Sequence, residues 1–167
     1  MTFIEAKQAY MEKRKEERDR ISLALKNAGF ENRKAAAGSE RYGAALDGEP
    51  YDLRNWQYIE GVFDNIRVHI SLQTFDRDSK TGNIHVLYDR IGLYYYRNEL
   101  SDPCRVVIRG VDKTTVANDY VLMMKPTRFE LPLTDEAIGE LVDMIKEDIK
   151  TIKASRQANY ENLAIGN

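Results

Sequence analysis

The chain has 167 residues, of which 43% are hydrophobic and 10% aromatic, and these proportions are typical of a packed globular core and exclude a disordered chain. The formal net charge of -2 excludes the strong overall basic field that draws nucleic acids and anionic membranes to many binding proteins. With 1 cysteine there is no internal disulfide framework, and no apolar run approaches the roughly 20 residues that a membrane span needs.

These properties predict a single domain over residues 1–167, since a chain of this length buries a sizeable core without dividing. The N-terminal residues lack the apolar segment of a secretory signal. We therefore expect a cytoplasmic protein that does not contact membranes. The oligomeric state is left open by the sequence.

The first predicted element is a helix over residues 2–28. Thr2 and Glu5 can form a capping box at its start, and Gly29 supplies the left-handed residue that commonly follows a helix end. Glu12 to Arg20 is an unbroken charged run between these ends, so no apolar stripe crosses the middle of the helix. We expect a solvated helix that is held only at its ends, by Ile4, Tyr10, Ile21, Leu25 and Ala28. A second interpretation is a helix that is presented to a partner.

Residues 31–55 carry the weakest pattern, and the sequence leaves their structure open. Ala35 to Ser39 reads as a loop, while 41–46 fits a short strand that ends at an Asp-Gly turn. We expect the sheet to occupy about residues 40–131, with a strand over 56–63. The Asp64-Asn65 pair that follows is compatible with a turn or with a bulge.

The clearest strand begins at residue 66. Ile66, Val68, Ile70 and Leu72 alternate with polar residues, which predicts one buried face and one solvated face. A second alternating run, 84–88, follows a loop rich in turn-forming residues, and we expect the two runs to form one long antiparallel hairpin. A turn centred near residue 79 would place Phe75 opposite Ile84.

Three further segments have the composition of strands, at 93–96, 105–111 and 120–124, and 129–131 is a last extended piece. A helix is then predicted over 134–153 or beyond, with Thr134 as its N-cap and Leu133 able to contact Ile138. Its apolar residues form one helical stripe: Ile138, Leu141, Val142, Ile145, Ile149 and Ile152. The elements together predict an α+β fold: an N-terminal helix, an antiparallel meander sheet of about five or six strands, and a C-terminal amphipathic helix packed on the sheet.

The residues that most often carry chemistry do not form a recognisable site. In the predicted hairpin, His69 and His85 would lie about 15 Å apart, too far to share a metal. Cys104 precedes a strand-like segment, whereas a nucleophilic cysteine needs a nearby base and often lies at a helix N-terminus. Neither Asp76-Arg77-Asp78 nor Gly110 to Thr114 completes a calcium or phosphate loop. We therefore predict no enzyme, no cofactor and no metal site.

Tyrosines alternate with arginines after the predicted hairpin, at Tyr88, Arg90, Tyr94 to Tyr96 and Arg97. Such residues can pack in a core, contact a protein or stack single-stranded bases. We favour a non-enzymatic protein-binding module, such as an inhibitor, an adaptor or an immunity-type protein. A second hypothesis is contact with nucleic acid through the basic first helix or the Tyr/Arg strand, and a third is a small hydrolase that uses Cys104.

The solvated face of the predicted hairpin is the expected partner-binding surface, because the closing helix needs only one face of the sheet. Its residues are Arg67, His69, Gln73, His85, Tyr95 and Arg97. The competing interpretation is that the first helix lies across this face and covers it. The sequence does not identify the partner or the biological process.

Overall fold

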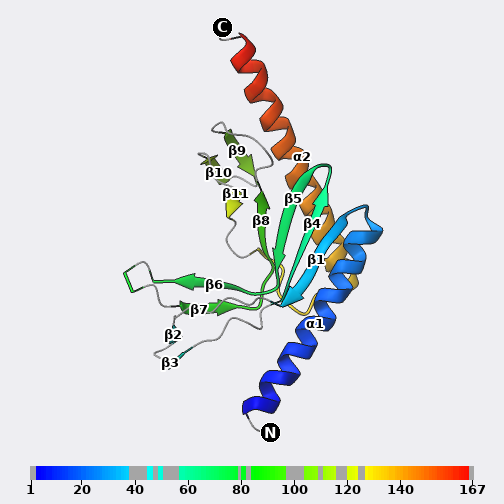
Figure 1. Cartoon of the computed structure of the whole chain (residues 1–167), viewed down its shortest axis with the longest axis vertical. Coiled ribbons are helices and arrows are strands. Elements are labelled where there is room, and N and C mark those ends of the chain that lie inside the picture. The colour runs from blue at the N-terminus through cyan, green and yellow to red at the C-terminus, as the bar shows by residue number, and fades with distance from the viewer. Residues whose placement is uncertain are drawn as a thin grey trace.

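The computed structural model of the protein describes residues 3–37, 45–46, 49–50, 57–78, 80–81, 84–96, 104–108, 111–115, 120–123 and 127–165. Two helices pack on one face of a five-stranded antiparallel sheet, which confirms the predicted α+β fold class (Figure 1). The helices are α1 (Phe3–Asn27) and α2 (Asp135–Ile165), and the sheet has the order β1 (Glu31–Ala37), β4 (Gln57–Phe63), β5 (Ile66–Ser71), β8 (Gly92–Tyr96) and β11 (Tyr120–Met123). Neither described helix has the length and apolar character needed to span a membrane.

The central sheet is a meander whose neighbouring strands follow one another along the chain, with three short hairpins between them. Each hairpin is a separate two-stranded antiparallel sheet. They are β2 (Ala45–Leu46) with β3 (Glu49–Pro50), β6 (Thr74–Arg77) with β7 (Ile84–Tyr88), and β9 (Cys104–Ile108) with β10 (Val111–Thr115). The β6–β7 hairpin extends away from the central sheet, whereas β9 contacts α2 (Figure 1).

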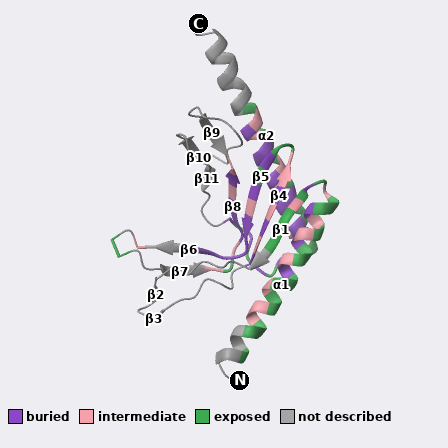
Figure 2. Cartoon of the chain, in the orientation of Figure 1, coloured by how far each residue is buried: buried purple, intermediate pink, exposed green. Residues whose placement is uncertain are grey.

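One face of the central sheet is buried against both helices (Figure 2). The alternation predicted for β5 is confirmed on this face, where Ile66, Val68 and Ile70 are buried. All six residues of the predicted apolar stripe in α2 are buried as well. Burying an aliphatic side chain of this size stabilises a fold by about 1.5–3 kcal/mol, so this layer holds the structure together.

The ends of both helices follow the sequence signals. Thr134 Oγ1 accepts a hydrogen bond from the Ala137 amide over 3.1 Å, which confirms Thr134 as the N-cap of α2. At the end of α1, Gly29 has a φ of 97° and the Phe30 amide donates to the Leu25 carbonyl over 3.0 Å. This is the left-handed helix end that Gly29 predicts, because a residue without Cβ enters this region without steric strain.

The middle of α1 contradicts the prediction of a helix held only at its ends. Glu17, within the charged run, is buried and accepts a hydrogen bond from the Leu133 amide, just before α2. Arg20 pairs with Glu17 over 3.0 Å and also donates to the Leu133 carbonyl over 3.0 Å. A carboxylate can be buried when its oxygens are paired in this way. Polar contacts therefore dock the middle of α1, where no apolar stripe exists.

The N-terminal half of α1 is held through Tyr10. Its hydroxyl donates to Asp89 Oδ1 over 2.7 Å and accepts from Gln73 Nε2 over 3.2 Å, and Arg14 pairs with Asp89 Oδ2 over 3.0 Å. Gln73 and Asp89 flank the two ends of the β6–β7 hairpin. These contacts therefore fix α1 against the base of that hairpin.

The titration of Tyr10 gives a first prediction. Burial, assisted by Asp89, raises the pKa of Tyr10 from 10.0 to about 12. The folded state therefore binds this proton more tightly than the unfolded state. The contribution of this proton to the free energy of unfolding is fully present below pH 10 and is lost as the pH rises toward 12.

We expect Tyr10→Phe to lower the stability at neutral pH and to flatten its decline between pH 10 and 12. Urea unfolding of wild type and variant at matched pH values measures this difference. The relevant quantity is the difference in the free energy of unfolding between the two proteins at each pH. Parallel stability curves for the two proteins would contradict the proposed linkage.

The predicted long hairpin of 66–74 with 84–88 is wrong. β5 pairs with β4 on one side and with β8 on the other, and within the described residues the 84–88 strand pairs with β6. Phe75 lies opposite Leu87 instead of Ile84. Alternation assigns the faces of a strand but does not identify its neighbour, and here the chain leaves the sheet after Ser71.

Asp64 and Asn65 form a two-residue turn, with φ values of 50° and 64°, and join β4 to β5. This geometry suits a tight hairpin and excludes the bulge that the sequence left open. Lys153 of α2 pairs with Asp64 over 2.6 Å.

The sheet begins at residue 31 rather than near residue 40. The segment 35–37, predicted as a loop, forms the end of edge strand β1 and pairs with β4. Alanine has a weak preference for strands, so the pairing with β4 outweighs the local preference. A register shift between Asn32 and Lys34 leaves Arg33 as a bulge.

Candidate functional site

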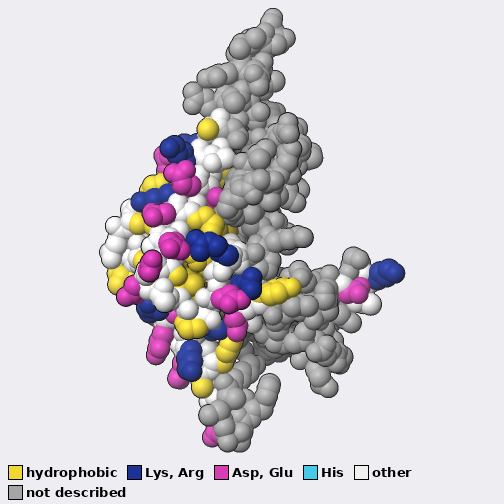
Figure 3. Space-filling model, turned by 180° about the vertical axis from the view of Figure 1, so that it is seen from behind, with side chains coloured by type: hydrophobic (Ala, Val, Ile, Leu, Met, Phe, Trp, Pro, Cys, Tyr) yellow, Lys and Arg dark blue, Asp and Glu magenta, His cyan; other side chains and the backbone are white. Residues whose placement is uncertain are grey.

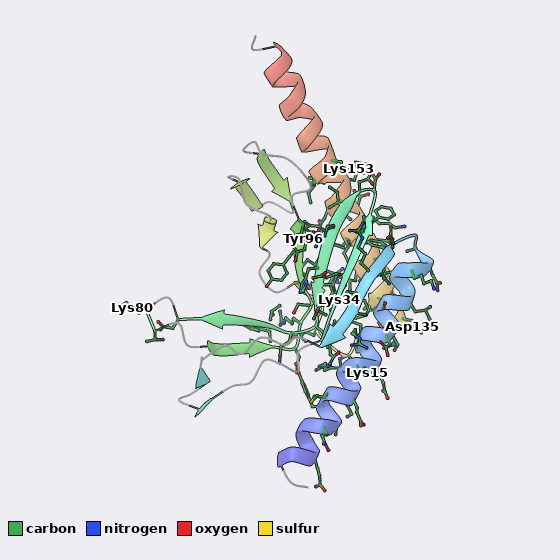
Figure 4. The ribbon with its side chains drawn as sticks, viewed as in Figure 1. Lys15, Lys34, Lys80, Tyr96, Asp135 and Lys153 are labelled. Carbon is green, nitrogen blue, oxygen red and sulfur yellow. The ribbon has the colours of Figure 1, made fainter. Side chains whose placement is uncertain are left out.

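The candidate site lies on the face of the sheet opposite the helices, called here the outer face. Its described residues come from four adjacent strands: Lys34 on β1, Tyr58 and Glu60 on β4, Arg67 and His69 on β5, and Tyr94 and Tyr96 on β8. Strand alternation places them there, since their neighbours Ile59, Val68 and Tyr95 are buried beneath the helices. Figure 4 shows where Tyr96 and Lys34 lie on β8 and β1.

The centre of the outer face is a row of four cross-strand neighbours. Lys34 lies opposite Glu60, Glu60 opposite His69, and His69 opposite Tyr94. His69 Nδ1 is 3.4 Å from Glu60 Oε1, and the side chain of His69 is only 13% exposed. The row places Glu60 between Lys34 and His69 and ends in the aromatic ring of Tyr94, an arrangement in which cross-strand pairs support one another.

The aromatic rings of this face are packed together. The His69 ring stacks on Tyr58 with centroids 5.0 Å apart and 17° between the planes, and it meets Tyr94 edge to face at 5.5 Å. Aromatic pairs in these geometries are worth about 0.5–1.5 kcal/mol beyond their buried area. The rings are therefore held in place by their contacts with one another.

Two cationic side chains, Arg67 and Lys34, also lie on the described part of the outer face. The Arg67 guanidinium lies 4.5 Å from the centroid of the Tyr96 ring, and Lys34 Nζ lies 5.7 Å from that of Tyr58. A hydrogen bond with Tyr58, assisted by the nearby Glu60 carboxylate, raises the pKa of Lys34. Both side chains are exposed.

The opposite side of the molecule, seen in Figure 3, has a different character. There, over the described residues, basic and acidic side chains intermingle. Ion pairs between exposed side chains, such as that of Arg128 with Glu140 of α2 over 3.2 Å, contribute little to stability. The outer face differs because its aromatic rings and cations are gathered together.

Two of the predicted site residues, Arg67 and His69, lie on the outer face as the alternation of β5 predicted. α1 does not cover them, because its contacts with Gln57 and Asn32 place it on the buried face. The competing interpretation, in which the first helix lies across this face, is therefore wrong.

The placement predicted for three other residues is wrong. Tyr95 is fully buried, and its hydroxyl donates to the buried Asp148 of α2 over 2.6 Å. Gln73 is buried beyond the end of β5, where it contacts Tyr10. His85 belongs to β7, outside the central sheet, and its side chain is not among those described. Arg97 lies outside the described residues.

Five members of the outer face were not predicted to lie on it: Lys34, Tyr58, Glu60, Tyr94 and Tyr96. Alternation within 57–63 could have identified Tyr58 and Glu60, since Ile59 between them is apolar. The prediction assigned the residues of β8 to the wrong faces of the sheet. It continued the alternation of residues 84–88 across Gly92, although that strand belongs to another sheet. Lys34 reaches its position opposite Glu60 through the bulge at Arg33, which no local pattern indicates.

The side chains of the outer face offer aromatic stacking and cationic hydrogen-bond donors. Within the described residues there is no group of three or more histidine, cysteine, aspartate or glutamate side chains that could hold a metal ion. Cys104 begins β9, and its side chain is not among those described. Comparison with models of known protein families, with curated proteins and with solved structures finds no match for this chain.

Proposed function

We propose that this chain is a non-enzymatic protein-binding module, such as an inhibitor, an adaptor or an immunity-type protein, and that it binds its partner through the outer face. The observation that carries the proposal is the cluster of Tyr58, His69, Tyr94, Tyr96 and Arg67 on the sheet face opposite both helices. The proposal requires no cofactor and assigns the protein to the cytoplasm.

The composition and rigidity of the cluster both favour a protein partner. Tyrosine and arginine are enriched at the residues that dominate binding energy in protein interfaces. Ordering a free side chain on binding costs about 0.5–1.5 kcal/mol, and rings already packed against each other lose less. The stack of His69 on Tyr58 and the contact of Arg67 with Tyr96 thus lower the entropic cost of association.

Binding of single-stranded nucleic acid is the second candidate, because aromatic rings and cations on an exposed antiparallel sheet can stack bases. Two observations disfavour it. The ring of Tyr58 already contacts His69 and Lys34, and that of Tyr96 already contacts Arg67, so bases would have to displace these contacts. Glu60 lies in the central row, where it would repel phosphates, and the whole chain carries a net charge of -2.

The test is affinity capture from the native host with the wild-type protein and two variants. Tyr94→Ala with Tyr96→Ala alters the outer face, whereas Leu23→Ala removes an apolar side chain that is 59% exposed on α1. We expect a partner protein that is retained by wild type and by Leu23→Ala and lost by the double variant. Circular dichroism checks that both variants remain folded.

Nuclease treatment and a salt series separate the two candidate functions. Binding through phosphates weakens steeply with salt, with a slope near one per neutralised phosphate, and disappears when the nucleic acid is digested. Retention of the partner after nuclease treatment and at moderate salt supports the proposal. A partner that the double variant still captures, or one that is lost with nuclease, would refute it.

A further inference from the structure

Arg67 differs from every other arginine whose side chain the structure describes. Six of them pair with a carboxylate: Arg14, Arg18, Arg20, Arg33, Arg90 and Arg128. Arg67 has none within the described part of the chain, and its one described partner is the ring of Tyr96. Among the described arginines, the one without a carboxylate partner therefore lies on the outer face, on the central strand β5.

The contact with Tyr96 holds the guanidinium without using its hydrogen-bonding capacity. A cation over an aromatic ring is attracted by the electrons of the ring face, and this attraction uses no N–H donor. Arginine carries five such donors in a planar fork that matches the two oxygens of a carboxylate. Arg67 is thus positioned, exposed and still able to form a bidentate ion pair.

We propose that Arg67 is the anchor for an acidic side chain of the partner protein, which would form a bidentate ion pair with the guanidinium above the Tyr96 ring. This inference rests on the proposed protein-binding function and adds the chemistry of the partner. Packing of the guanidinium on Tyr96 stabilises the charge and fixes its orientation, so little further ordering is needed when the carboxylate arrives.

A carboxylate fits this position better than the phosphates of a nucleic acid. Glu60 lies on the neighbouring strand β4, two residues from Val62, which pairs with Arg67. Its carboxylate would repel a nucleic acid, which carries a negative charge on every nucleotide. A single acidic side chain among neutral residues brings one charge to Arg67. The remaining contacts of the face, to Tyr58 and Tyr94, suit neutral or apolar groups.

The inference can be tested without knowing the partner, by using two probes of equal charge. One is a terminally blocked peptide with a single glutamate among neutral residues, and the other is a thymidine oligonucleotide with a single phosphate, the dinucleotide. The Nε–H resonance of Arg67 is followed by nuclear magnetic resonance during each titration of the full-length protein. We expect saturable shifts of Arg67 with the peptide at low salt, and weaker binding of the oligonucleotide. Arg67→Lys keeps the charge but loses the fork, and should weaken peptide binding about tenfold.

Arg128→Lys is the matched control, since Arg128 is exposed and already paired with Glu140 of α2. This substitution should leave peptide affinity unchanged. Tighter binding of the oligonucleotide, equal effects of the two substitutions, or no shift of Arg67 with the peptide would each overturn the inference. The peptide titration can contradict the role of Arg67 while the affinity capture still depends on Tyr94 and Tyr96. In that case the proposed protein-binding function is supported and the role of Arg67 is refuted.

Discussion

Replacing Ile70 with aspartate is expected to unfold the protein. Ile70 is fully buried at the centre of β5, between strands β4 and β8 and beneath the helices. An aspartate there would either bury an unpaired charge or remain protonated at a large cost, and it would also lose the packing of the isoleucine. The combined cost of at least about 4 kcal/mol is comparable with the whole stability of a domain of this size.

Arg67→Asp is the control, since it introduces the same side chain into the same strand at an exposed position and should cost about 1 kcal/mol or less. Circular dichroism with urea unfolding measures both variants. Ser71 is not a suitable control, although alternation alone predicts that Ser71→Asp costs little, because Ser71 is fully buried and donates to the Gln73 carbonyl. Similar stabilities for the Ile70 and Arg67 variants would show that the two faces of β5 are wrongly assigned.

Glu17→Ala is the second substitution for which we expect a large effect. The change leaves the buried Leu133 amide without an acceptor and removes the carboxylate that pairs with Arg20. Hydrogen bonds to charged groups contribute about 1.5–3 kcal/mol, and an unsatisfied buried amide adds a desolvation cost. We expect the free energy of unfolding to fall by about 2–4 kcal/mol.

The neighbouring residue provides the comparison. Glu16→Ala removes the same side chain from an exposed position of α1 and should change the stability by no more than about 0.5 kcal/mol. Urea unfolding of the two variants gives the difference directly. A loss for Glu17→Ala as small as that for Glu16→Ala would mean that the contact of Glu17 with Leu133 does not hold the middle of α1.

The parts of the fold that could be predicted are those that depend only on residues close together in the sequence. The buried stripe of α2, the Thr134 cap, the Gly29 helix end and the buried face of β5 all follow from local periodicity or from local hydrogen bonding. Strand pairing does not, because β5 has the same alternation whichever strand lies beside it. Glu17 was missed for a related reason: its partner, the Leu133 amide, is more than a hundred residues away along the chain.

The candidate site was predictable only within β4 and β5, where local alternation separates the two faces. Arg67 and His69 follow from the alternation of β5, but the phase of β8 depends on which residue lies opposite Val68. That residue is Tyr95, so Tyr94 and Tyr96 lie on the outer face, and the prediction chose the wrong tyrosine. A run of three tyrosines contains no local information that distinguishes the two phases.

The β6–β7 hairpin leaves the central sheet after Ser71 and returns at Gly92, and these two residues lie opposite each other in β5 and β8. Near its base, Leu72 and Ile91 belong to the core, whereas Lys80 and Thr81 at its far end are exposed. The end of this hairpin should therefore accept insertions and deletions without changing the pairing of β5 with β8. It is a suitable site for inserting an affinity tag, and one at which length can vary while the rest of the sheet is conserved.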